Sequence, residues 1–155
     1  MSVPLTADAI AGLLPHRHPF LFLAYAEILS KTEARGMAVW PEDHPIFAGH
    51  FPAHPIVPAV CQVEAIAQLG GVLIGATARR NGEVPVASAC GLLALIKAAT
   101  FHAPVAPGQR LHMHCSVRRF SKEAFLVKAE GRLSGNLATR CDCVLAVKTV
   151  AGSSG

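Results

Sequence analysis

The sequence predicts an α+β protein in which an antiparallel sheet packs on one long buried helix. Residues 58–78 (PAVCQVEAIAQLGGVLIGATA) are apolar on every side, as expected for a central helix. Segments that alternate between apolar and polar residues lie before and after this helix, without the regular strand–helix alternation of βαβ folds. We therefore expect one domain over residues 1–150 and a flexible tail at 151–155.

The elements before the central helix are short. TADAIAGLL (6–14) predicts a helix with Thr6 as its N-cap, and Pro15 ends it. Two strands are predicted next, at 20–29 and 34–40, and they are followed by a loop at 41–58. The loop is rich in proline, glycine and histidine, and a long ordered loop often carries function.

The central helix is predicted to begin with Pro58 at its first position. A transmembrane span is the alternative, because the length is almost sufficient. Gln62, Glu64 and Gln68 interrupt the apolar run and strands follow it, which favours a buried helix in a protein without membrane insertion. Four later strands are predicted, at 85–96, 110–120, 123–133 and 137–148.

Composition limits the partners and the compartment. The chain has 52% hydrophobic and only 15% charged residues, so we expect an oligomer that covers apolar surface. A net charge of +4 favours acidic partners, but the basic clusters at 79–80 and 118–122 are too sparse for nucleic acid. The N-terminus does not resemble a signal peptide, which favours a cytoplasmic location. Five scattered cysteines in apolar segments are typical of reduced core thiols.

Glu64 is the only formally charged residue between Phe51 and Ala78. A buried carboxylate is costly unless it is paired, hydrogen-bonded or protonated, so Glu64 is a candidate proton donor. A structural glutamate, bonded to a nearby donor or facing a subunit contact, is the alternative, and the residue alone leaves both interpretations open.

His50 lies in the loop before the helix, between Gly49 and Phe51, and histidine is the natural general base near neutral pH. It is one of eight histidines. A metal site formed by His44, His50 and His54, or by one of the H-x-H pairs His16/His18 and His112/His114, is the alternative. No cysteine or carboxylate stands at a characteristic ligand spacing and no serine-hydrolase elbow is present, so we expect neither a metal site nor a serine hydrolase.

Three stretches together resemble a known family. LPHRHPF (14–20), IFAGHFPAHPIVPAVCQVEAIAQ (46–68) and TFHAPVAPGQRL (100–111) closely resemble FabZ-type 3-hydroxyacyl-[acyl-carrier-protein] dehydratases. The resemblance implies a hot-dog fold, in which the sheet wraps around the central helix. It also implies homodimers, in some members assembled into hexamers as trimers of dimers. Each active site then takes catalytic His50 from one chain and catalytic Glu64 from the other.

The resemblance also implies a reaction. His50 would remove the α-proton of the thioester, and Glu64 would protonate the departing β-hydroxyl, either directly or through a held water, giving a trans-2-enoyl thioester and water. Backbone amides at Ala59 and Val60 would bind the enolate oxygen. The remaining expected substrate contacts are Phe51 and Gln68. No cofactor is expected, because the substrate is carried on the phosphopantetheine of acyl carrier protein, which would approach a basic rim.

Several positions depart from the family pattern. Ala53 and Ala59 replace usual glycines, Ala24–Tyr25 replaces an Asp-Arg pair, and Thr100 replaces a basic residue. These changes favour a specialised pathway such as polyketide or aryl-polyene synthesis. The related dehydratase–isomerases have a similar motif but carry aspartate where Glu64 stands, so the resemblance implies dehydration without double-bond migration. The alternatives are another hot-dog enzyme, a thioesterase or enoyl-CoA hydratase, and a non-catalytic module that binds acyl chains.

Overall fold

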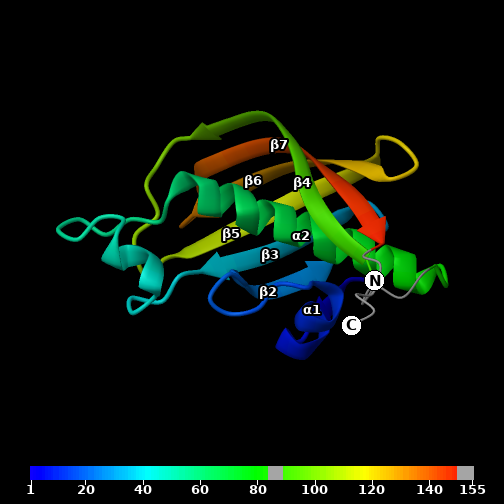
Figure 1. Cartoon of the computed structure of the whole chain (residues 1–155), viewed down its shortest axis with the longest axis horizontal. Helices are drawn as coiled ribbons and strands as arrows, with labels where there is room; N and C mark the ends of the chain where they lie inside the picture. Colours follow the sequence, from blue (N-terminus) through cyan, green and yellow to red (C-terminus); the bar gives the residue numbers. More distant parts are fainter. Residues whose placement is uncertain (84–88, 150–155) are drawn as a thin grey trace, which may run out of the picture.

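A single curved sheet of seven antiparallel strands wraps around one long helix, α2 (Figure 1). The computed structural model describes residues 1–83 and 89–149. The strand order is β1-β2-β3-β5-β6-β7-β4. The strands are β1 (Val3–Leu5), β2 (Leu23–Ile28), β3 (Glu33–Val39), β4 (Ala89–Phe101), β5 (Arg110–Arg119), β6 (Ala124–Leu133) and β7 (Asn136–Thr149). The helices are α1 (Ala7–Leu13), the short 3-10 helix η1 (Pro45–Ala48) and α2 (Ala59–Arg80).

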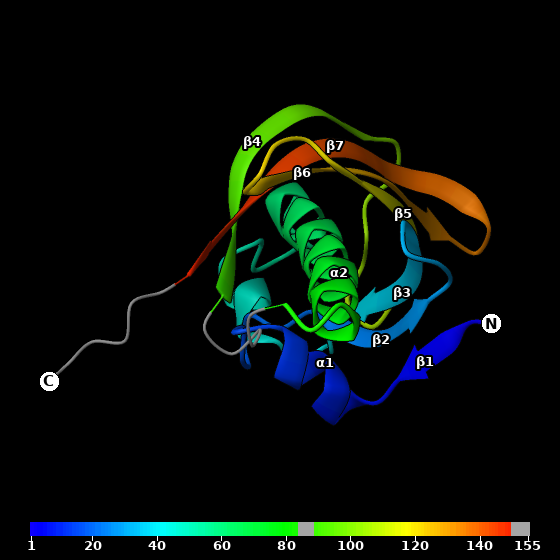
Figure 2. The same cartoon turned by 90° about the vertical axis from the view of Figure 1, so that its right-hand side faces the viewer.

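Helix α2 forms the centre of the core, as its apolar sequence predicts. Viewed nearly along its axis, it lies inside the curve of the sheet (Figure 2). Among the described residues it is the one helix long and apolar enough to cross a membrane by length and composition, but 78% of its most apolar window is buried inside the protein. Its hydrophobicity is therefore used in packing against the sheet.

The later strands follow the predicted period of two. In β5, buried Leu111, Met113, Cys115 and Val117 alternate with more exposed polar residues. In β7, Cys141, Cys143 and Leu145 face the core. The four cysteines whose side chains are described are free and buried, as predicted for core thiols, and the side chain of Cys90 lies outside the described part. Burial raises the pKa of Cys115 to about 12, so this thiol is unreactive.

Several predicted boundaries are wrong. Pro58 is the N-cap of α2 rather than its first helical residue, and α2 continues to Arg80. The strand predicted at 20–29 begins only at Leu23, and β1 and η1 were not predicted. The strand predicted at 85–96 continues to Phe101, while its residues 85–88 and the predicted tail lie outside the described residues.

Strand β4 is the last strand of the sheet and pairs only with β7. Its outer edge is therefore open to pairing with another chain. Large apolar side chains are exposed along this strand, namely Leu92, Leu93, Leu95, Ile96 and Phe101. An exposed apolar edge strand of this length is typical of a surface that another chain covers.

Candidate active site

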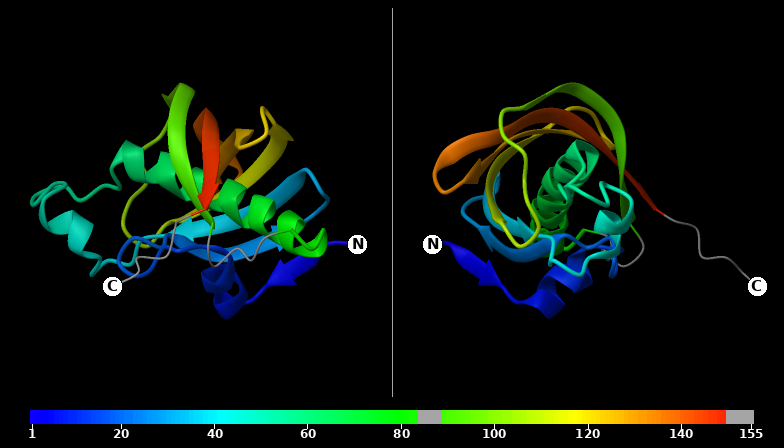
Figure 3. Two further views of the ribbon diagram at one scale, coloured as in Figure 1. Left: turned by 45° about the vertical axis from the view of Figure 1, so that its right-hand side comes forward. Right: turned by 90° about the vertical axis from the view of Figure 1, so that its left-hand side faces the viewer.

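His50 lies on the loop between η1 and α2. This loop projects beyond the N-terminal end of α2 (Figure 3). Its Nδ1 lies 2.9 Å from the carbonyl oxygen of Ile56, and its ring stacks on Phe51 with 4.0 Å between centroids. A carbonyl oxygen only accepts hydrogen bonds, so Nδ1 carries the proton in the neutral ring. Nε2 then keeps its lone pair, which is the form that a general base requires.

The first turn of α2 lies next to this histidine. A cavity of about 380 Å³ is lined by His50, Phe51, Ala59 and Gln62, among others. Pro58 provides no side-chain cap. The Cys61 N–H donates to the Pro58 carbonyl at 2.9 Å. The amides of Ala59 and Val60 precede it and have no acceptor within the helix, so they form a positive end suited to an oxygen anion. Ala59 lines the cavity, whereas Val60 is 72% exposed.

Glu64 lies one turn further along α2 and faces a different cavity, of about 240 Å³. Its side chain is 18% exposed. The Oε1 atom accepts a hydrogen bond from Gln68 Nε2 at 3.0 Å and lies 2.9 Å from His16 Nε2. The carboxyl is thus partly buried and held by two neighbouring polar groups.

Gln68 fixes the loop that precedes β2. Its Oε1 accepts from the Phe22 N–H at 3.0 Å, and its Nε2 donates to the Phe20 carbonyl at 2.8 Å and to Glu64. The amide is 1% exposed and lines the same cavity as Glu64. These long-range bonds also explain the late start of β2, because they occupy backbone groups that a strand would use for pairing.

The predicted residues therefore form two groups within one chain. We call His50, Phe51 and Ala59 the His50 half-site, and Glu64, Gln68 and His16 the Glu64 half-site. The two groups line separate cavities that share no residue. One chain alone does not bring the histidine and the glutamate into one cavity.

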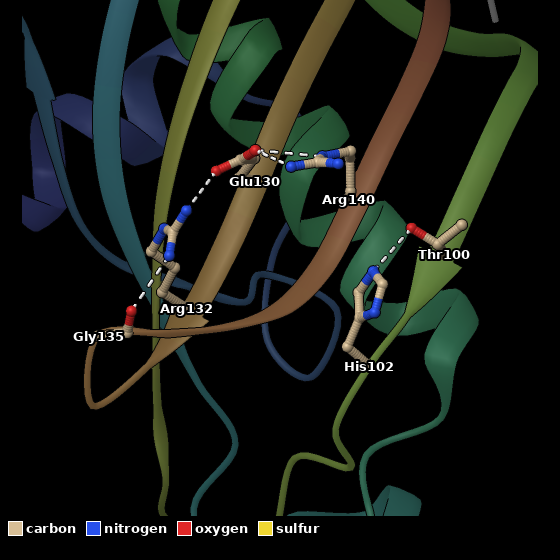
Figure 4. A network of polar contacts seen from close by, with 6 residues as sticks. All are labelled: Thr100, His102, Glu130, Arg132, Gly135 and Arg140. Carbon is tan, nitrogen blue, oxygen red and sulfur yellow. Dashed lines mark hydrogen bonds and ion pairs between the residues drawn. The ribbon is translucent and has the colours of Figure 1, made fainter.

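Other polar groups lie outside these half-sites. His102 lines the His50 cavity, and its Nε2 lies 3.2 Å from Thr100 Oγ1. Figure 4 shows this pair beside β4 and a second network in which Glu130 accepts from Arg132 and Arg140. No group of three potential metal ligands occurs within the described ranges.

Sequence reasoning missed two residues that contact the site. The sequence pattern places His16 only in an H-x-H pair, whereas in the fold its Nε2 lies 2.9 Å from Glu64 Oε1. Gln62 accepts a hydrogen bond from buried Thr139 and lines the His50 cavity. Both contacts join segments far apart in the chain, and no local pattern signals them. At the substituted Ala24–Tyr25 positions, the Tyr25 hydroxyl donates to Glu27 at 2.6 Å.

Comparison with known proteins identifies the family to which this chain belongs. Residues 27–136 match the ApeI-like family, described as ApeI dehydratase. A 3-hydroxyacyl-[acyl-carrier-protein] dehydratase FabZ from Nitratidesulfovibrio vulgaris is 33% identical over 139 residues, covering 89% of this chain and 88% of the relative. The FabZ of Agrobacterium fabrum is 36% identical over 140 residues, with 88% and 87% covered.

The fold is also found among solved structures. The dehydratase heterocomplex ApeI:P from Xenorhabdus doucetiae superimposes with a TM-score of 0.75 at 17% identity, covering 90% of this chain and 91% of that one. The wrapped sheet, its central helix and these similarities define a dehydratase with the hot-dog fold. The chain belongs to the ApeI-like dehydratase family.

Proposed function

We propose that the protein dehydrates 3-hydroxyacyl thioesters, carried by acyl carrier protein, to trans-2-enoyl thioesters in fatty acid or polyketide-like synthesis. The observation that carries this proposal is the state of His50. Its Nδ1 is engaged by the Ile56 carbonyl, which leaves a basic Nε2 beside the open first turn of a helix. This is the arrangement that abstraction of a proton next to a thioester carbonyl requires.

In the proposed mechanism, His50 Nε2 takes the α-proton of the substrate. The C–H electron pair moves toward the thioester carbonyl, whose oxygen becomes negative and accepts hydrogen bonds from the Ala59 and Val60 amides. The electron pair then returns to form the Cα–Cβ double bond. The Cβ–O bond breaks as Glu64 gives its proton to the hydroxyl, which leaves as water. Phe51 and Gln68 border the two cavities that hold the substrate.

We further propose that the active form is a homodimer joined along β4. The open apolar edge of β4 offers backbone groups for strand pairing and apolar side chains for burial. A second copy would bring its His50 half-site to the Glu64 half-site of the first. Further assembly into a hexamer, as a trimer of dimers, would follow the family resemblance.

The acyl chain would occupy the cavity beside α2. Apart from Glu64, Glu83, His16 and Gln68, this cavity has a largely apolar lining that includes Ala67, Gly71, Ile74, Leu93 and Leu145. The net charge of +4 suits an acidic carrier protein. Free thiols at the four described cysteines fit a reducing compartment, so we place the reaction in the cytoplasm. The proposed mechanism uses side chains and backbone amides alone, so it requires no cofactor.

The test supplies 3-hydroxyacyl and trans-2-enoyl thioesters, each on acyl carrier protein and on coenzyme A. Enoyl absorbance and free thiol are followed separately. We expect reversible enoyl formation without thiol release, faster on the carrier protein. Thiol release without enoyl interconversion would identify a thioesterase instead. Preference for coenzyme A would identify a hydratase, and binding without turnover would identify an acyl-binding module.

A further inference from the structure

Glu64 is bound on one oxygen only. His16 Nε2 and Gln68 Nε2 both reach Oε1, at 2.9 and 3.0 Å. Within the described part of the chain, no hydrogen bond reaches Oε2. When both neighbours donate to Oε1, they occupy its two acceptor positions, and a proton carried by the carboxyl then belongs on Oε2.

The orientation of Gln68 is fixed independently of Glu64. Its Oε1 accepts from Phe22 N–H, so the other terminal atom is the amide nitrogen, which donates to Glu64 and to the Phe20 carbonyl. An ionised carboxylate only accepts hydrogen bonds, so toward the ionised form of Glu64 the His16 Nε2 makes a favourable contact only when it carries a hydrogen.

The position of His16 is set by the loop before β2. Arg17 Nη1 donates to the Leu14 carbonyl at 2.9 Å. The His16 ring stacks on Phe20 at 6.5 Å between centroids, with 14° between the planes. Phe20 in turn packs against Phe22 at 4.9 Å. The imidazole is therefore held by packing on one side and faces Glu64 on the other.

The remaining nitrogen of His16 is unusual. His16 Nδ1 is buried and has no hydrogen-bond partner among the described residues. A buried unsatisfied polar atom destabilises a fold by about 1–3 kcal/mol, so it is retained where another role outweighs that cost. The His16 ring lines the cavity proposed for the substrate. Its other nitrogen, Nε2, does have a partner, and that partner is the Glu64 carboxyl.

We propose that His16 is a positioning residue of the dehydratase: its Nε2–H holds Glu64 Oε1, so that Oε2 presents the proton to the departing hydroxyl. This inference rests on the proposed function. His16 does not exchange a proton with the substrate. It restricts rotation of the carboxyl, and losing that restriction slows the chemical step rather than substrate binding.

The test compares three substitutions at one position. Glutamine places a donor nitrogen close to the position of the histidine Nε2, whereas asparagine is too short to do so and alanine has no donor. We expect His16→Ala and His16→Asn to lower kcat by about 10- to 100-fold, the scale of a misplaced catalytic group, with KM changed much less. His16→Gln should recover most of kcat. Thermal unfolding of each variant checks the fold.

Equal losses in His16→Gln and His16→Ala would overturn the proposal, as would a change confined to KM. Nitrogen-15 NMR of histidine-labelled wild-type protein gives a test that needs neither turnover nor an altered fold, with His16→Gln used only to assign the signal. A hydrogen-bonded Nε2–H at His16 is expected, and an Nδ1–H tautomer would overturn the proposal. A wild-type protein inactive on every thioester would refute the proposed function, while the NMR result still decides the contact.

Discussion

Single contacts give the two proposed catalytic residues different chemical roles. The Ile56 carbonyl engages His50 Nδ1 and leaves Nε2 free to accept a proton. His16 and Gln68 hold one oxygen of Glu64 and leave the other available. His50 is thus arranged to act as a base and Glu64 to act as an acid.

Glu64→Gln keeps the size of the side chain and its place on α2 but removes the acidic proton. We expect turnover to fall by about 100- to 10,000-fold, the usual contribution of a general acid. Steady-state enoyl formation measures the loss, and Glu123→Gln, at an exposed site in the β5–β6 turn, is the matched control. A Glu64→Gln protein with wild-type turnover would remove Glu64 from the mechanism.

A second prediction concerns stability in acid. Hydrogen bonds from Ser2, Tyr25 and Arg35 lower the pKa of Glu27 from 4.5 to about 2. The folded state therefore binds this proton less readily than the unfolded state, so the stabilisation is present above pH 4.5 and is lost as the pH falls toward 2. Trp40, the only tryptophan, is fully buried and reports unfolding by fluorescence.

Glu27→Gln should lower the midpoint of thermal unfolding at pH 6 and flatten its decline between pH 4.5 and 2. The measurement is a series of melting curves of both proteins across that range. Parallel pH profiles for the wild type and the variant would contradict the assigned role of Glu27.

Among the elements, α2 and the later strands could be predicted from the sequence because burial imposes local periods on them. The apolar run of α2 and the alternation in β5 are both visible in the sequence and confirmed in the fold. The start of β2 could not be predicted, since it depends on bonds between Gln68 and the backbone at Phe20 and Phe22. The contact of His16 with Glu64 could not be predicted either, because it joins two segments that are far apart in the sequence.

The packing of α2 against the sheet depends on Gly70. A methyl group there would lie 2.8 Å from Val127 Cγ2 and 3.4 Å from Leu145. Gly70→Ala should therefore destabilise the protein by about 1–3 kcal/mol through overpacking. Gly12→Ala is the matched control on α1, where nothing lies within 4 Å of the added methyl, and it should stabilise by about 0.4–1 kcal/mol.

Chemical denaturation followed by Trp40 fluorescence compares the two alanine variants. If Gly70→Ala were as stable as Gly12→Ala, the close approach between α2 and the sheet would be wrong. A loss of stability limited to Gly70→Ala would assign Gly70 to packing of α2 against the sheet.

For the whole molecule, the open edge of β4 predicts dependence of activity on assembly. Leu95 on β4 is 53% exposed in the single chain, and a buried aspartate at that place would disfavour a dimer. We expect Leu95→Asp to give a folded monomer without turnover. Phe120→Asp alters a similarly exposed apolar residue away from β4 and should remain dimeric and active. Sedimentation measures the mass, and a fully active Leu95→Asp monomer would contradict the shared site.

The central claim is that each active site combines His50 of one chain with Glu64 of another. The most direct measurement mixes His50→Ala and Glu64→Gln chains, each inactive alone, and allows them to exchange. Random exchange makes half of the dimers mixed, and each mixed dimer has one intact site of two, so about a quarter of wild-type turnover should return. No recovery after verified exchange would contradict the claim, because sites built within one chain stay defective in every mixed dimer.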